Sequence, residues 1–235
     1  MVSFVSQSRS RPFAGRLIRD SLDIQFCMSQ RIGILGGTFN PVHLGHLIIA
    51  QMVAKKYRFN QVLFIPCYLP PHKYKQPRGL IQAKHRLQML RRAIADNPLF
   101  KVSDIEIKRG GKSYSIDTIR SLQSGYPEGC KFYFIIGADT LRELSTWHAV
   151  NELVRLAYFV TVARPGKQEV KPDWSNIAAV FGEGVARVLR RYYSDRPLIG
   201  ISSKEIREKI KRGESVKYLV PPSVEQYIIK HRLYQ

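Results

Sequence analysis

The sequence is poor in cysteine and has no long apolar run. Its three cysteines, Cys27, Cys67 and Cys130, are odd in number and lie far apart without a CxxC pair. That pattern argues against a disulfide framework and a thiolate metal site, and it favours a reducing cytoplasm. No apolar stretch approaches the roughly 20 residues that cross a bilayer, so no membrane partner is expected.

Two common nucleotide-binding patterns are also missing. The GxGxxG fingerprint does not occur, and the GKS tripeptide at Gly111, Lys112 and Ser113 has Glu106 where a P-loop needs glycine. We interpret GKS as a turn between a strand and a helix. The sequence carries no RNP, KH or zinc-finger signature and no internal repeat, so nucleic acid is not an expected partner.

Acidic residues are few. Asp and Glu number 18 against 38 Lys and Arg, which gives a net charge of +20. Such a balance attracts polyanions, but the charges are spread along the chain and indicate a generally basic surface. Anionic substrates are compatible with it. An RNA-binding protein built on a nucleotide fold is the alternative, and salt-sensitive RNA affinity without ATP turnover would favour it.

The first 27 residues differ in composition from the rest. They hold no acidic residue before Asp20 but four arginines and several serines, as a transit peptide does. A start at Met28 explains the same pattern, since Met28 leads directly into the first apolar segment. On either interpretation we expect residues 1–27 to be dispensable and residues 28–235 to form one domain.

From Arg31 onward, short apolar runs alternate with helical stretches. The runs predict strands at 31–37, 61–67, 100–107, 131–137 and 155–163, and helices are expected to begin near His43, Gln82, Ser115 and Thr146. Near-continuous apolar strands are typical of a sheet buried on both faces. The prediction is an α/β fold with a Rossmann-like, doubly wound, mainly parallel sheet.

The tail after Pro165 is less regular. Residues 184–193 are compatible with one amphipathic helix, and two closing helices are expected at 202–211 and 222–231. These last two carry start signals, a serine pair in one case and prolines in the other.

The segment with the most chemical information follows the first strand and reads GGTFNPVHLGH, residues 36–46. Its glycines, Gly36 and Gly37, allow backbone N–H groups to approach a phosphate, and the following helix start adds donors. His43 and His46 are three residues apart and share one helix face. A metal site is disfavoured because no cysteine or carboxylate lies beside them.

His43-Leu44-Gly45-His46 resembles the signature of the HxGH nucleotidyltransferases. Further segments occur in the order typical of the bacterial nicotinate-nucleotide adenylyltransferases. They are Pro70-Pro71-His72-Lys73, Ser113 to Thr118, Gly137-Ala138-Asp139, Trp147-His148, Arg164-Pro165-Gly166 and Ile201 to Arg207. The resemblance extends from about Arg31 to the C-terminus.

Three positions depart from the pattern of that family. Asn40 stands where aspartate is frequent, and Ser115 and Lys204 stand where threonine is common. Asn40 and Ser115 keep short polar side chains, so little change is expected there. Lys204 affects only its own side-chain contact.

The resemblance implies transfer of the adenylyl group of ATP to nicotinate mononucleotide, with Mg²⁺ accompanying ATP. His43 and His46 are then the catalytic candidates. The phosphate-binding candidates are Gly36, Gly37, Thr38, Phe39, Ser202, Ser203 and Arg207. Asp139 would contact a ribose hydroxyl or the metal, although an aspartate there could equally cap a helix.

For the mononucleotide, the resemblance implies stacking on Trp147 and contacts from Lys73, Ser115 and His148. A core tryptophan and a solvated lysine are the simpler interpretations of Trp147 and Lys73. Adenylyltransferases that take phosphopantetheine or nicotinamide mononucleotide are the nearest alternatives, and the PPHK and WH segments argue against them. The sequence favours no particular oligomeric state.

Overall fold

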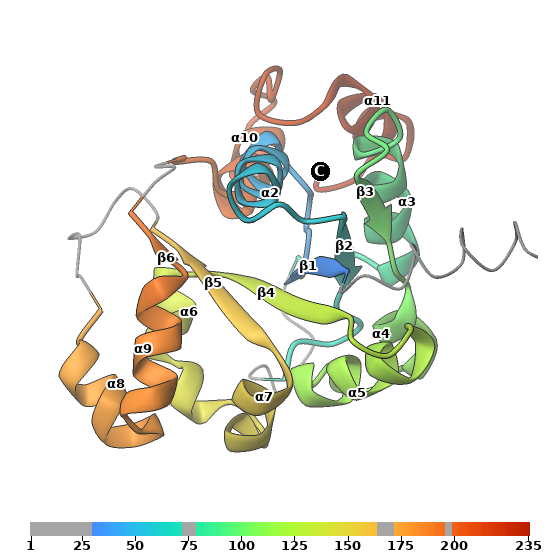
Figure 1. The fold of residues 1–235 in the computed structure, drawn as a ribbon. Helices are drawn as coiled ribbons and strands as arrows, with labels where there is room; N and C mark the ends of the chain where they lie inside the picture. The colour runs from blue at the N-terminus through green and yellow to red at the C-terminus, as the bar shows by residue number, and fades with distance from the viewer. Residues whose placement is uncertain (1–29, 72–78, 164–171, 196–198) are drawn as a thin grey trace, which may run out of the picture.

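A parallel sheet forms the centre of the computed structural model, which describes residues 30–71, 79–163, 172–195 and 199–235. Its strands are β1 Arg31–Gly37, β2 Gln61–Pro66, β3 Phe100–Val102, β4 Lys131–Gly137, β5 Tyr158–Val162 and β6 Tyr193–Ser194. They lie in the order β3-β2-β1-β4-β5-β6, and every neighbouring pair is parallel (Figure 1). This is the doubly wound order, and its winding reverses between β1 and β4. The predicted fold class is confirmed.

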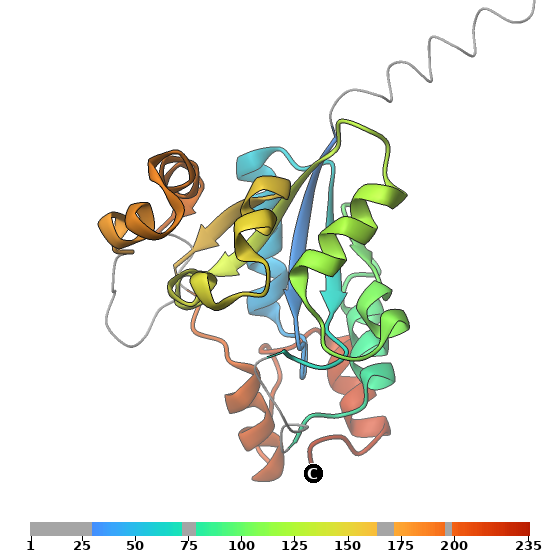
Figure 2. The same ribbon diagram turned by 90° about the horizontal axis from the view of Figure 1, so that it is seen from below.

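Helices cover both faces of the sheet. They are α2 Leu44–Tyr57, α3 Ala83–Ala93, α4 Ile105–Arg109, α5 Ser115–Gly125, α6 Ala138–Arg142, α7 Val150–Leu156, α8 Trp174–Phe181, α9 Glu183–Arg191, α10 Ser203–Lys211 and α11 Pro222–Lys230, with a 3-10 turn η1 at Leu144–Thr146. Figure 2 shows α10 and α11 beyond the carboxyl ends of β1 and β2. Within the described part of the chain, no helix is both long and apolar enough to cross a bilayer.

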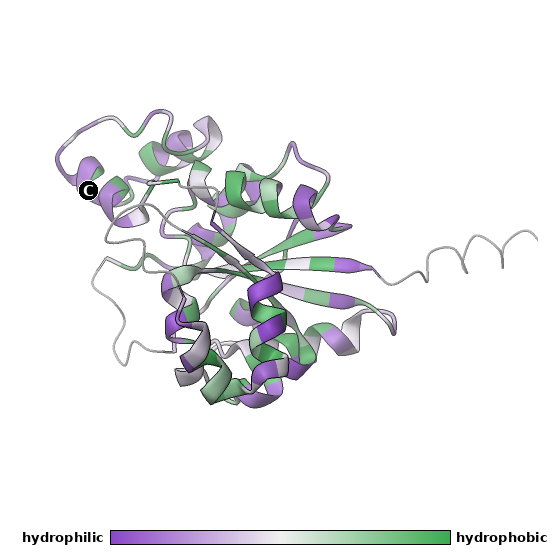
Figure 3. Ribbon diagram, turned by 60° about the vertical axis from the view of Figure 1, so that its left-hand side comes forward, coloured by the Kyte–Doolittle hydropathy of each residue, from purple (hydrophilic) through white to green (hydrophobic). Residues whose placement is uncertain are grey.

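Alternate residues of each central strand enter two separate hydrophobic cores. In β4, Tyr133 and Ile135 pack with α2, α3, α10 and α11, whereas Phe132, Phe134 and Ile136 pack with α5 to α9. Successive side chains of a strand point to opposite faces, so a strand covered on both faces must be apolar throughout. This explains the long hydrophobic stretches along the strands in Figure 3.

The third predicted strand was wrong after Val102. The last ladder bond of β3 runs from the Ser103 N–H to the Phe64 carbonyl oxygen, and at Asp104 the chain turns into α4. The alternation of Ile105 and Ile107 imitates a strand, but the Lys108 N–H donates to the Asp104 carbonyl oxygen in a helical pattern. The GKS tripeptide therefore follows a helix and not a strand.

Other boundaries also differ from the prediction. Residues 155 and 156 end α7 instead of starting β5, and the helix expected from Thr146 begins only at Val150. The predicted helix at 184–193 ends at Arg191, after which Tyr193 and Ser194 form β6. The helix α8, which was not predicted, precedes it.

Candidate active site

A cavity of about 970 Å³ opens at the carboxyl ends of β1, β2 and β4, where the strand order reverses. Ligands of doubly wound sheets bind at this place. Eleven of the candidate residues line the cavity: Gly36, Gly37, Thr38, Phe39, His46, Ser115, Asp139, Trp147, His148, Ser203 and Arg207. His43 and Ser202 do not line it, and Lys73 lies outside the described residues.

The two histidines lie together, with different surroundings. His43 is the buried N-cap residue of α2, and its ring stacks on that of His46 with 3.7 Å between centroids. The His43 backbone N–H donates to His46 Nδ1 at 3.2 Å. Because Nδ1 accepts, the neutral ring of His46 carries its proton on Nε2, at the opposite side of the ring. His46 therefore lines the cavity as a hydrogen-bond donor. His43, which does not line the cavity, stacks on its ring.

The end of β1 leaves open space at the cavity. A Cβ atom added to Gly36 would meet nothing within 4 Å, so its absence leaves room beside the backbone. Phe39, by contrast, is 2% exposed and adopts a left-handed φ of 48°. Such a conformation costs a non-glycine residue ~1–3 kcal/mol and persists only where packing enforces it. Here Phe39 packs against Phe64 and His46.

Helix α10 is joined to the loop after β1 by hydrogen bonds. Ser202 caps the helix by accepting from the Lys204 N–H, and Ser203 Oγ donates to the Pro41 carbonyl oxygen at 2.8 Å. Arg207 donates to the carbonyl oxygens of Asn40 and Ser203 at 2.7 and 3.1 Å. Arg207 is thus held at the cavity wall, with donors left over for a ligand.

The start of α5 and the segment after η1 also line the cavity, from the face of the sheet opposite α2 and α10. Ser115 is the first residue of α5, and the helix start supplies backbone N–H donors. The Trp147 ring packs edge-on against Phe159 at 6.2 Å and also lines the cavity, so it belongs to the core and to the site. His148 lies 4.6 Å from the Tyr114 ring.

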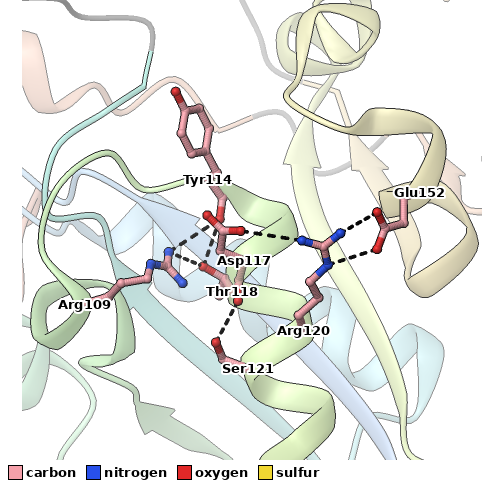
Figure 4. A network of polar contacts seen from close by, with 7 residues as sticks. All are labelled: Arg109, Tyr114, Asp117, Thr118, Arg120, Ser121 and Glu152. Atoms are coloured by element: carbon pink, nitrogen blue, oxygen red, sulfur yellow. Dashed lines mark hydrogen bonds and ion pairs between the residues drawn. The ribbon is translucent and has the colours of Figure 1, made fainter.

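Glu106 is a cavity-lining residue that the sequence analysis missed. It is 8% exposed, and the Thr118 hydroxyl donates to its carboxyl group at 2.7 Å. Arg109 in turn donates to the Thr118 hydroxyl at 3.0 Å, as Figure 4 shows. Burial raises the pKa of Glu106, and its hydrogen bonds from Thr118 and Ser113 oppose that rise. The signal in the sequence was a glutamate between two isoleucines, Ile105 and Ile107.

Arg86 is a second missed residue. It is 1% exposed and donates to the carbonyl oxygens of Thr38, Cys67, Tyr68 and Ile81 at 2.9, 2.6, 3.1 and 3.2 Å. Its guanidinium therefore links the ends of β1 and β2 below the cavity. The signal was an arginine on the apolar face of a helix, one turn before Leu90.

The cavity suits a metal ion that arrives with a substrate. Among the described residues, no group of three His, Cys, Asp or Glu side chains could hold a metal by itself. Mg²⁺ typically takes one or two protein carboxylates and completes its shell with water and phosphate oxygens. Asp139 and Glu143 are exposed carboxylates in the cavity lining, and they fit that requirement.

Comparison with known proteins agrees with this architecture. The cytidylyltransferase-like family matches residues 34–209. The chain is 41% identical to a "Probable nicotinate-nucleotide adenylyltransferase" of Thermoanaerobacter over 87% of this chain and 94% of the relative. It is 44% identical to a protein of the same name from Synechococcus, over 87% and 95%.

A solved structure shares the fold. The nicotinic acid mononucleotide adenylyltransferase of Plasmodium falciparum, complexed with NaAD, superposes with a TM-score of 0.68. The sequences are 21% identical, and the match covers 87% of this chain and 97% of the other.

Proposed function

The chain belongs to the nicotinate-nucleotide adenylyltransferases of the cytidylyltransferase-like family, and we propose that its cavity joins ATP to nicotinate mononucleotide. The products are nicotinate adenine dinucleotide and pyrophosphate, a step of NAD biosynthesis. One observation carries the proposal. A single cavity is lined by His46 and Arg207, from helices on one face of the sheet, and by Ser115 and Trp147, from elements on the other face; we call these its two ends.

The reaction is an in-line attack of the 5'-phosphate of the mononucleotide on the α-phosphorus of ATP. A phosphate monoester has its second pKa near ~6, so this nucleophile is ionised at neutral pH and needs no general base. Catalysis then requires positioning and neutralisation of growing negative charge. The reaction therefore needs no ionised carboxylate as a general base. Glu106, a buried carboxyl group of the cavity lining, is given no role in proton transfer.

At the ATP end, His46 Nε2–H is the donor to the reacting phosphate, and His43 holds its ring. The start of α10 and Arg207 hold the leaving pyrophosphate, because helix N–H groups and a guanidinium both bind phosphate oxygens. Mg²⁺ bound with ATP would add charge neutralisation, with Asp139 as its protein contact.

At the other end, Trp147 stacks on the pyridine ring. Ser115 and the backbone N–H groups at the start of α5 and at His148 donate to the nicotinate carboxylate. A carboxylate only accepts hydrogen bonds, so a pocket of donors satisfies it. Lys73 is a further phosphate contact by resemblance. The proposal needs no membrane or nucleic acid, and it sets the reaction in the cytoplasm.

Parallel assays test the proposal. The enzyme receives ATP and Mg²⁺ with nicotinate mononucleotide, nicotinamide mononucleotide, phosphopantetheine or glycerol 3-phosphate, and pyrophosphate release is measured. The amide of nicotinamide leaves one or two N–H groups facing other donors, at ~1–3 kcal/mol each. We therefore expect nicotinate mononucleotide to be preferred over the amide by at least ~10²-fold in kcat/KM.

Two results would contradict the proposal. Equal turnover of both mononucleotides would refute the donor-only pocket and indicate an enzyme of dual specificity. Absence of turnover with all four acceptors, together with salt-sensitive RNA binding, would instead support the RNA-binding alternative.

A further inference from the structure

The side chain of Asn40 is buried beside the cavity and uses both ends of its amide. It is 6% exposed. Its Nδ2 donates to the Gly79 carbonyl oxygen at 2.8 Å, while its Oδ1 accepts from the Tyr234 hydroxyl at 2.9 Å and from the Ile81 N–H at 3.4 Å. A carbonyl can only accept and a backbone N–H can only donate, so these neighbours determine the orientation of the amide.

The backbone of the same residue receives α10. The Asn40 carbonyl oxygen accepts from Arg207 at 2.7 Å, and the next carbonyl oxygen, that of Pro41, accepts from the Ser203 hydroxyl at 2.8 Å. The side chain of Asn40 is therefore fixed by Gly79, Ile81 and Tyr234. The carbonyl oxygen of the same residue accepts from Arg207.

We infer that Asn40 is a positioning residue for the ATP end of the site: its amide sets the peptide on which Arg207 docks. The inference rests on the proposed function, which assigns Arg207 to ATP. It also revises an expectation from the sequence, because aspartate is not equivalent to asparagine here. A carboxylate of the same size cannot donate to the Gly79 carbonyl oxygen and would face it at hydrogen-bonding distance.

The inference is tested with Asn40→Asp, which changes one donor into an acceptor at nearly constant volume. Loss of one buried hydrogen bond, with an acceptor left facing it, corresponds to about a tenfold effect or more. We expect KM for ATP to rise by at least about tenfold, and KM for the mononucleotide to stay within about twofold, because Arg207 acts at the ATP end.

A matched control comes from Asn97, whose Nδ2 donates to Gln51 Oε1 at an exposed site. Asn97→Asp removes an amide donor in the same way and should leave both KM values unchanged. Tyr234→Phe removes only the hydroxyl that donates to Asn40 Oδ1. It should raise KM for ATP in the same direction by a smaller factor, and it keeps the test available if Asn40→Asp does not fold.

Direct titration with α,β-methylene-ATP separates this inference from the proposed function. If wild-type protein binds the analogue but does not turn over nicotinate mononucleotide, the proposed function is refuted. The affinities of the variants for the analogue can still be compared with that of wild type. The positioning role would be overturned if a folded Asn40→Asp variant bound the analogue with wild-type affinity, or if both KM values rose equally. If Asn40→Asp does not fold, it would be overturned if Tyr234→Phe had no effect.

Discussion

Substitution of Arg86 with methionine tests what holds the carboxyl ends of β1 and β2 together. The guanidinium donates to four backbone carbonyl oxygens, and methionine fills similar space without a donor. A hydrogen bond to a charged group is worth ~1.5–3 kcal/mol. Arg86→Met also removes the desolvation penalty of the buried cation, several kcal/mol. The net loss in the free energy of unfolding should therefore resemble that of a broken buried ion pair, about 3–5 kcal/mol.

This loss corresponds to a large shift in thermal stability. For a chain of this size 1 kcal/mol changes the melting temperature by about 2–4 °C, so Arg86→Met should melt about 6–20 °C below wild type. Calorimetry measures the shift. Arg91→Met is the control, because Arg91 lies on the same helix with 51% of its side chain exposed and should change stability by less than about 0.5 kcal/mol. If Arg86→Met melted within about 2 °C of wild type, the four carbonyl contacts would not be stabilising.

Four further predictions concern other residues. His46→Ala should lower kcat by ~10²–10³ with KM for ATP nearly unchanged; in steady-state assays, an unchanged kcat with a raised KM would make His46 a ground-state contact. Trp147→Ala should weaken nicotinate and nicotinamide mononucleotides equally, since stacking reads the ring, and unequal KM changes would contradict this. Burial raises the pKa of Glu106 in the folded state, so its contribution to stability is present below the unfolded value of ~4.3 and is lost as pH rises through the folded value. Urea midpoints of wild type should therefore fall relative to Glu106→Gln over that window, and parallel curves would be inconsistent with a raised pKa. A chain starting at Met28 should keep full turnover, and loss of folding or activity would make residues 1–27 part of the domain.

The central strands could be predicted because burial on both faces of the sheet requires an apolar sequence. β1 and β4 match the predicted ranges 31–37 and 131–137, since a strand covered on both faces is apolar throughout. The errors arise where distant contacts decide. Tyr193 and Ser194 form a strand because they pair with Thr161 and Val162, and two residues carry no local strand signal.

The site shows the same division. The HxGH segment and the Trp147 region could be proposed from the sequence because each is a contiguous pattern that resembles a known family, and the structure brings residues of both to one cavity. Arg86, Glu106 and Asn40 could not be interpreted in this way, since their roles depend on neighbours from other elements. The sequence alone treats Asn40 as similar to aspartate. The Gly79 carbonyl oxygen beside it makes the difference.

The bond between Asn40 and Tyr234 joins residues 194 positions apart, which has a consequence for synthesis. A ribosome adds ~5–20 residues per second, so Tyr234 is made about 10–40 s after Asn40. During that interval the loop after β1 exists without Tyr234 against it, and for most of the interval without Arg207 as well. The sheet can form on the nascent chain, but the loop that receives Arg207 gains the hydroxyl of Tyr234 only near the end of that interval, so stabilisation by ATP should reach its full value only after Tyr234 has been made.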